Sequence, residues 1–198
     1  MALREAIGIL ALGAVLGAAA ESGETSRAKA FQQLGTMFDW NRRRAESIVV
    51  GWPDLPASLA RMAMDEYGEP DRVEPLELAW YDRKPFSRII VYADPEIAAP
   101  PFPLVQIVAY PLVPGKWEAV AAIDRGVSYD PILRSLVAGS SSYAHNLLAL
   151  NLADEVIRGT RTSAQARDFY DQTIALTYAG KSSPYLRRLL FKPARKVP

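Results

Sequence analysis

The side chains best suited to catalysis in this sequence are three consecutive serines and the only histidine: Ser140, Ser141, Ser142 and His145. A serine nucleophile needs a general base within hydrogen-bond reach, and a third group must orient that base. The segment lacks the Gly-x-Ser-x-Gly turn that exposes a hydrolase nucleophile, and serines ahead of a helix commonly cap it. We therefore expect a capping role, and a Ser/His hydrolase is the third of three functional hypotheses.

A run of carboxylates in the first half of the chain offers oxygen atoms to a metal ion. Its spacing does not follow the alternation of an EF-hand loop, and two prolines interrupt it. The chain has no cysteine and one histidine, which excludes disulfides, iron–sulfur clusters and cysteine-ligated zinc. We expect solvated carboxylates and neither a metal nor a cofactor. The run comprises Asp65, Glu66, Glu69, Asp71, Glu74 and Glu77.

Aromatic residues recur through the sheet and helix segments at positions that could line a pocket for a small molecule. Packing between a helix and a sheet uses the same residue types. A small-molecule-binding protein is therefore the alternative functional hypothesis. The candidate pocket residues are Trp80, Tyr110, Trp117, Tyr170 and Tyr178.

The C-terminal segment concentrates positive charge among apolar side chains. From Lys181 onward there are six cations and no acid, so a net charge of +1 for the whole chain leaves −5 for residues 1–180. Such a mixture suits an anionic membrane surface or an acidic partner. A mobile solvated tail, or a last helix with its leucines on the core, are the alternatives. The residues expected to bind are Tyr185, Arg187, Arg188, Phe191, Lys192, Arg195 and Lys196.

An uncharged apolar run near the start, Ala6 to Ala20, indicates the compartment. As a helix it would reach ~22 Å, short of the ~30 Å hydrocarbon core of a bilayer. Small residues at positions 18 and 20 precede Glu21, as at a signal-peptide cleavage site. We expect residues 1–20 to be a signal peptide or a retained membrane anchor, and the protein to be periplasmic and membrane-associated.

Composition places the rest of the chain among globular proteins. The chain has 198 residues, of which 49% are hydrophobic and 23% charged, enough for one compact domain. The small net charge provides no field that would attract nucleic acid. We expect an N-terminal arm over 21–52, an α+β domain over 53–180 and a basic tail over 181–198.

Hydrophobic periodicity predicts the α+β class: a small, mainly antiparallel sheet of about four strands, packed by helices and followed by a C-terminal helix pair. Gly159 is the expected stop of the first helix of that pair, and Thr162 with Gln165 forms a capping-box pattern for the second. The expected elements are a helix over 56–67, strands over 76–81, 87–92, 104–110 and 127–137, a short helix over 116–124, and final helices starting at Ser142 and Thr162.

Several motifs occur in the same order as in a known group of proteins. They are Tyr67-Gly-Glu-Pro70-Asp71, Pro75-x-x-Leu78-x-Trp80 and Arg88-Ile-Ile-Val91-Tyr92, followed by Val113-Pro-x-Lys116-Trp117 and Asn146-Leu-Leu-Ala-Leu150-Asn151-Leu-Ala. Over residues 67 to 180 the chain resembles a family of uncharacterised secreted proteobacterial proteins. The resemblance implies export and a fold, and it implies no reaction. The chain departs from the family at Asp130-Pro131 and over 140–145.

The leading hypothesis combines these observations. A chain with one histidine, no cysteine and no glycine-rich phosphate loop has few means of activating a nucleophile. We therefore expect a non-enzymatic periplasmic protein that associates with the membrane and serves as a binding or accessory subunit of an envelope or membrane-protein complex.

Overall fold

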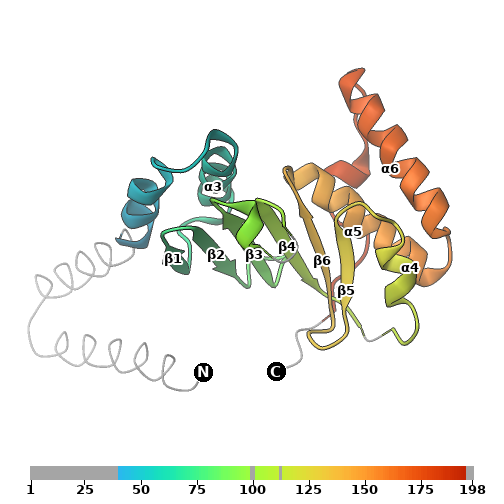
Figure 1. Ribbon diagram of the computed structural model, residues 1–198. Helices are drawn as coiled ribbons and strands as arrows, with labels where there is room; N and C mark the ends of the chain where they lie inside the picture. The colour runs from blue at the N-terminus through green and yellow to red at the C-terminus, as the bar shows by residue number, and fades with distance from the viewer. Residues whose placement is uncertain (1–39, 99–100, 112, 195–198) are drawn as a thin grey trace, which may run out of the picture.

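A computed structural model describes residues 40–98, 101–111 and 113–194. The described residues form a six-stranded antiparallel sheet with the strand order β1-β2-β3-β4-β6-β5 (Figure 1). The strands are β1 (Arg72–Glu74), β2 (Glu77–Tyr81), β3 (Arg88–Tyr92), β4 (Leu104–Ala109), β5 (Val127–Asp130) and β6 (Ser135–Ser140).

Helices cover one face of this sheet. The helix α3 packs on β3, and α5 packs on β4, β5 and β6 with α6 against it. Among the described residues, no helix combines the length and the apolar character needed to cross a bilayer. The helical elements are a stretch over 40–49, α3 (Asp54–Tyr67), α4 (Trp117–Ala121), α5 (Tyr143–Arg158) and α6 (Ser163–Tyr178), with short 3-10 turns η1 (Pro95–Ile97) and η2 (Pro184–Leu186).

The alternation of side chains along the strands separates two apolar clusters. On β2, Leu78 and Trp80 belong to the main core under the helices, whereas Ala79 belongs to a smaller cluster on the opposite face. On β4, Leu104 and Val108 likewise join the main core. The second cluster comprises Ala79, Ile90, Val105 and Ile107, flanked by Tyr81, Tyr92 and Val137.

The predicted α+β class is confirmed, but the sheet has six strands and not about four. The strand β1 has three residues, too few to show a periodic pattern. The single strand predicted over 127–137 is wrong, because the chain reverses after Asp130 and forms two strands, β5 and β6. The Asp130 carboxylate accepts hydrogen bonds from the backbone N–H groups of Ile132 and Leu133, which stabilises that reversal.

The predicted ends of the final helix pair are confirmed. The residue Gly159 ends α5 in the left-handed region at φ 75°. The capping box of Thr162 and Gln165 begins α6. The residue Ser142 occupies the N-cap of α5 without a capping bond from its side chain. Instead, the Ser140 hydroxyl accepts from the Ser142 N–H at 3.0 Å and donates to the Ser142 carbonyl at 2.8 Å.

The main core extends beyond both ends of the domain expected over 53–180. Before that range, Ala45, Val49 and Trp52 are buried in it. After it, four apolar side chains pack against it from the segment predicted as a tail: Tyr185, Leu186, Leu189 and Phe191. The expected signal peptide and residues 21–39 of the expected arm lie outside the described residues.

Two glycines with the same backbone conformation allow a matched test of the close packing beside β5. Both Gly126 (φ 68°) and Gly115 (φ 71°) are left-handed. A Cβ at residue 126 would overlap the Gly139 carbonyl oxygen and lie 3.2 Å from the Phe102 ring, whereas one at 115 meets nothing within 4 Å.

We expect Gly115→Ala to lower the free energy of unfolding by about 1 kcal/mol, the cost of the left-handed backbone. The change Gly126→Ala should cost about 3 kcal/mol or more, because the steric overlap adds to that cost. Urea unfolding followed by tryptophan fluorescence measures both. Equal losses for the two variants would contradict the close contact at Gly126.

Candidate binding surface

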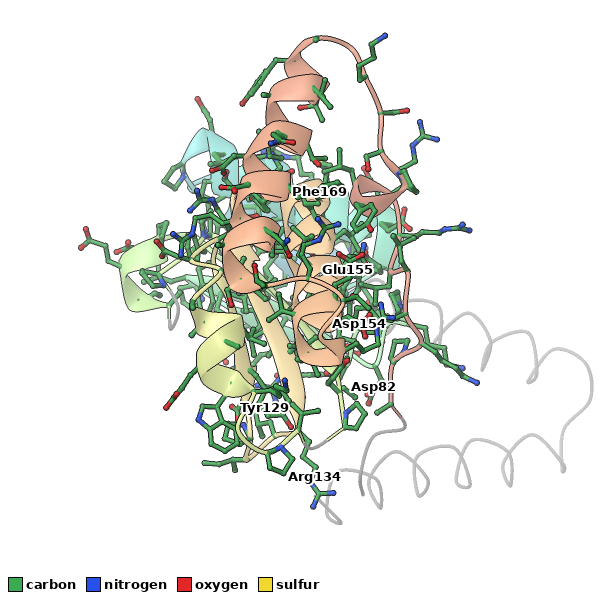
Figure 2. The ribbon with its side chains drawn as sticks, turned by 90° about the vertical axis from the view of Figure 1, so that its right-hand side faces the viewer. Asp82, Tyr129, Arg134, Asp154, Glu155 and Phe169 are labelled. Carbon is green, nitrogen blue, oxygen red and sulfur yellow. The ribbon has the colours of Figure 1, made fainter. Side chains whose placement is uncertain are left out.

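One edge of α5 carries polar side chains that face the C-terminal segment, which we define as residues 184–194. The residues Asn151, Asp154 and Glu155 lie at i, i+3 and i+4, so they share one side of the helix. Both Asn151 and Asp154 are buried, and buried polar groups need partners. Figure 2 shows Asp154 and Glu155 beside the segment that descends along α5.

The amide of Asn151 binds the backbone of the C-terminal segment at three points. Its Nδ2 donates to the carbonyl oxygens of Tyr185 (3.1 Å) and Arg188 (2.9 Å). Its Oδ1 accepts from the N–H of Leu190 at 2.7 Å. An amide suits this task because it donates and accepts at once. These bonds fasten an otherwise irregular stretch to the helix.

The Asp154 carboxylate connects α5 to Tyr110, the residue that follows β4, and Tyr110 in turn contacts the C-terminal segment. The carboxylate accepts from the Tyr110 hydroxyl at 2.7 Å and from Arg158 Nε at 2.8 Å. The Tyr110 ring meets the Phe191 ring edge to face, with centroids 5.5 Å apart. Burial, followed by the hydrogen bond to Asp154, raises the pKa of Tyr110 above its usual value, so the hydroxyl remains a donor.

The Glu155 carboxylate connects α5 to the upper part of the segment. It accepts from the Tyr185 hydroxyl at 2.5 Å and from Arg161 Nε at 2.7 Å. Burial would raise the pKa of Glu155, but the hydrogen bonds from Tyr185 and Arg161 outweigh it and the pKa lies below its usual value. The Arg161 guanidinium also lies 4.4 Å from the Phe169 ring centroid.

These contacts divide the residues predicted to bind a membrane or a partner. The aromatic members, Tyr185 and Phe191, face the fold, while Arg187, Arg188 and Lys192 are exposed. The two arginines line a shallow open hollow of ≈ 320 Å³ with Ser182 and Pro184. The remaining predicted members, Arg195 and Lys196, lie outside the described residues. The backbone of the C-terminal segment is thus bound to α5, and its described cations are exposed to solvent.

The five aromatic residues predicted to line a pocket occupy different layers of the molecule. Trp80 is fully buried and donates its indole N–H to a backbone carbonyl at 2.9 Å. Tyr110 is buried under the C-terminal segment, and Tyr170 is half-buried on α6. Trp117 is 39% exposed at the start of α4, and Tyr178 is 86% exposed at the end of α6. The fold does not gather them around one cavity.

The side chain of His145 packs against an aromatic ring of α6. The imidazole meets the Tyr170 ring edge to face, with centroids 6.1 Å apart. Burial lowers the pKa of His145 below its usual value, so the imidazole is neutral at pH 7. The hydroxyl of Ser140 is engaged with the backbone of Ser142. The capping role expected for the serines is met in position only: Ser142 stands at the N-cap of α5, but its side chain makes no capping bond.

Most of the carboxylates considered as metal ligands pair with arginines. Asp65 lies 3.3 Å from Arg42, and Asp71 lies 3.1 Å from Arg83. Arg72 lies between Glu74 (3.6 Å) and Glu77 (3.4 Å). Within the part of the chain that the structure describes, no three carboxylate or imidazole side chains gather in a way that could hold a metal ion.

The sequence reasoning did not single out the polar edge of α5. The signal was present, because Asn151 and Asp154 interrupt an otherwise apolar stretch of helix. Polar residues that fall within a buried helix face need internal partners. The pattern does not say which segment supplies them.

Comparison of the chain with protein-family models, curated proteins and solved structures finds no match.

Replacing Asn151 tests how firmly the C-terminal segment is attached. We expect Asn151→Ala to lower the free energy of unfolding by about 3 kcal/mol, since it removes three hydrogen bonds worth roughly 1 kcal/mol each. The matched control Asn41→Ala removes one side-chain bond, to the Pro70 carbonyl, and should cost about 1 kcal/mol. Hydrogen exchange at the Leu190 amide should accelerate in Asn151→Ala alone. Unchanged exchange there would contradict the attachment.

The single imidazole allows a direct titration. We expect the NMR-derived pKa of His145 to lie below 6.5, because burial disfavours the charged form. The unfolded chain then binds a proton at His145 at a higher pH than the folded protein does. Protonation of His145 therefore lowers the free energy of unfolding as the pH falls below about 6.5. In Tyr170→Ala the loss of the covering ring should move the pKa upward. A value at or above 6.5 in the unmodified protein would contradict the described burial.

Proposed function

We propose that this chain is a non-enzymatic accessory protein of the periplasm that lies at an anionic membrane surface, where it serves an envelope or membrane-protein complex. The observation that carries the proposal is the attachment of the C-terminal segment to α5, which leaves Arg187, Arg188 and Lys192 exposed. The compartment follows from the apolar run of residues 6–20, which is predicted to be an export signal.

A fastened cationic segment suits an anionic surface better than a free tail. A backbone already ordered by Asn151 loses less conformational entropy on binding. Guanidinium groups form paired hydrogen bonds with phosphate oxygens, and each cation near an anionic lipid surface contributes up to ~1 kcal/mol. The hollow beside Arg187 and Arg188 is open to a headgroup phosphate.

Charge reversal on the exposed side of the segment tests this proposal. We expect R187E/R188E to weaken binding to vesicles containing phosphatidylglycerol at least tenfold, because two attractive charges become repulsive. Raising the salt concentration should weaken binding of the unmodified protein, since the Debye length shortens from ~10 Å at 0.1 M to ~3 Å at 1 M. Co-sedimentation measures both effects. Reversal is more informative than truncation, because the segment also covers the core.

The matched control is R43E/R44E, which reverses two adjacent exposed arginines on the helical stretch 40–49. Its vesicle affinity should stay within about twofold of the unmodified protein. Equal losses for the two pairs, or binding that salt does not weaken, would contradict a specific role for the C-terminal segment. Purification from membranes adds a second readout: a stoichiometric protein partner supports the accessory role, whereas a monomer with a bound metabolite supports the small-molecule hypothesis.

A further inference from the structure

The turn between β5 and β6 presents two large aliphatic side chains to solvent. Ile132 is 90% exposed and Leu133 is 57% exposed. The neighbouring strand residues Tyr129 and Leu136, which pair across the hairpin, are buried. Figure 2 shows Arg134 extending from this end of the molecule, away from the body of the fold. The hairpin is therefore buried at its base and apolar at its projecting tip.

Hydrogen bonds on both sides of the turn hold its backbone in place. The Asp130 carboxylate accepts from the N–H groups of Ile132 (2.8 Å) and Leu133 (2.9 Å). The Arg134 carbonyl accepts from the N–H of Tyr110 at 2.8 Å, and Arg134 itself is left-handed at φ 47°. Because these bonds determine the course of the backbone, the exposure of the two aliphatic side chains is a property of the fold.

Cations surround this tip because the antiparallel order brings several connections to the same end of the sheet. The strands β2, β4 and β5 all end there, and the Ala194 N–H donates to the Ala109 carbonyl at 2.9 Å. Figure 1 shows the β5–β6 turn and the end of the described C-terminal segment at that end. The exposed cations on these connections are Lys84, Lys116, Arg134 and Lys192, and among them lies an exposed carboxylate, Asp82.

The opposite end of the sheet carries acidic residues. Glu74 and Glu77 flank the β1–β2 turn and share one cation, Arg72. The connection that follows β3 adds the exposed Asp94 and Glu96. Charge is thus polarised along the strand direction, with the apolar tip at the basic end. A surface that attracts one end of this molecule repels the other, so the polarity selects an orientation.

A lipid surface fits this end better than a protein partner does. A specific protein interface covers about 800 Å² on each partner, whereas this feature is a narrow projecting turn. Apolar side chains ringed by lysine and arginine match the layered chemistry of an anionic bilayer, where phosphates lie above the acyl chains.

We propose that the β5–β6 turn inserts Ile132 and Leu133 into the interfacial layer of an anionic bilayer, while Lys116, Arg134 and Lys192 contact the headgroups. This inference rests on the proposed membrane association and adds the insertion element and the orientation. The protein then stands on the basic end of its sheet, with its acidic end pointing away from the membrane.

The absence of cysteine makes a site-specific test simple, because one introduced cysteine is the only thiol in the chain. The variant I132C, labelled with an environment-sensitive fluorophore in the full chain, should shift its emission to the blue on phosphatidylglycerol vesicles. Lipids with a nitroxide near the headgroup should quench it. The control V50C places the same label at a residue that is 77% exposed and outside the β5–β6 turn, where the emission should stay as in buffer.

A second variant measures the contribution of the tip to affinity. We expect I132S/L133S to bind phosphatidylglycerol vesicles at least tenfold more weakly, with a melting temperature within about 2 °C of the unmodified protein because both side chains are exposed.

The outcomes separate this inference from the proposed function. If the protein sediments with anionic vesicles while labelled I132C and V50C both keep their emission in buffer, the insertion of the tip is overturned and the membrane association stands. If labelled I132C shifts equally on phosphatidylcholine vesicles, the role of the cations is overturned. If the unmodified protein does not sediment with anionic vesicles, the inference fails together with its premise. A blue shift in I132C alone, with weaker binding of I132S/L133S, supports it.

Discussion

The need to satisfy buried polar groups on α5 organises much of this molecule. The helix uses its apolar face against the sheet, which leaves Asn151 and Asp154 inside the protein and away from water. Unpaired, such groups would cost about 1–3 kcal/mol each. The C-terminal segment supplies backbone partners for Asn151, and Tyr110 supplies a hydroxyl for Asp154. The course of residues 184–194 is therefore a consequence of polar groups on a helix about 35 residues earlier in the chain.

That arrangement also explains why the cations face outward. The same stretch that places Tyr185 against Glu155 and Phe191 against Tyr110 leaves Arg187, Arg188 and Lys192 on the far side. The attachment continues to the end of β4, where Ala194 binds Ala109. The C-terminal segment therefore packs against the fold with its aromatic side chains and exposes its cations to solvent. It ends near the apolar turn of the β5–β6 hairpin (Figure 1).

Prediction succeeded where the physics is local. The caps at Gly159 and Thr162 were correctly expected because a helix end is determined by the few residues around it. The predicted number of strands was wrong because it depends on strand pairing. The strand β1 is too short to show alternation, and the β5–β6 turn lies within a run rich in residues that favour strands. The direction of the C-terminal aromatic residues was not derivable either, because Glu155 lies 30 residues before Tyr185.

The amino-acid sequence settles the chemistry that this chain has at hand. The composition provides one imidazole and no thiol, and the order of the residues places apolar side chains near the start and cations near the end. No fold alters these properties. Folding settles which of these groups meet and which face water. The pairing of Tyr185 with Glu155 and the exposure of Ile132 arise because antiparallel strands and packed helices bring distant residues together, and contacts of that kind leave no periodic trace in a linear chain.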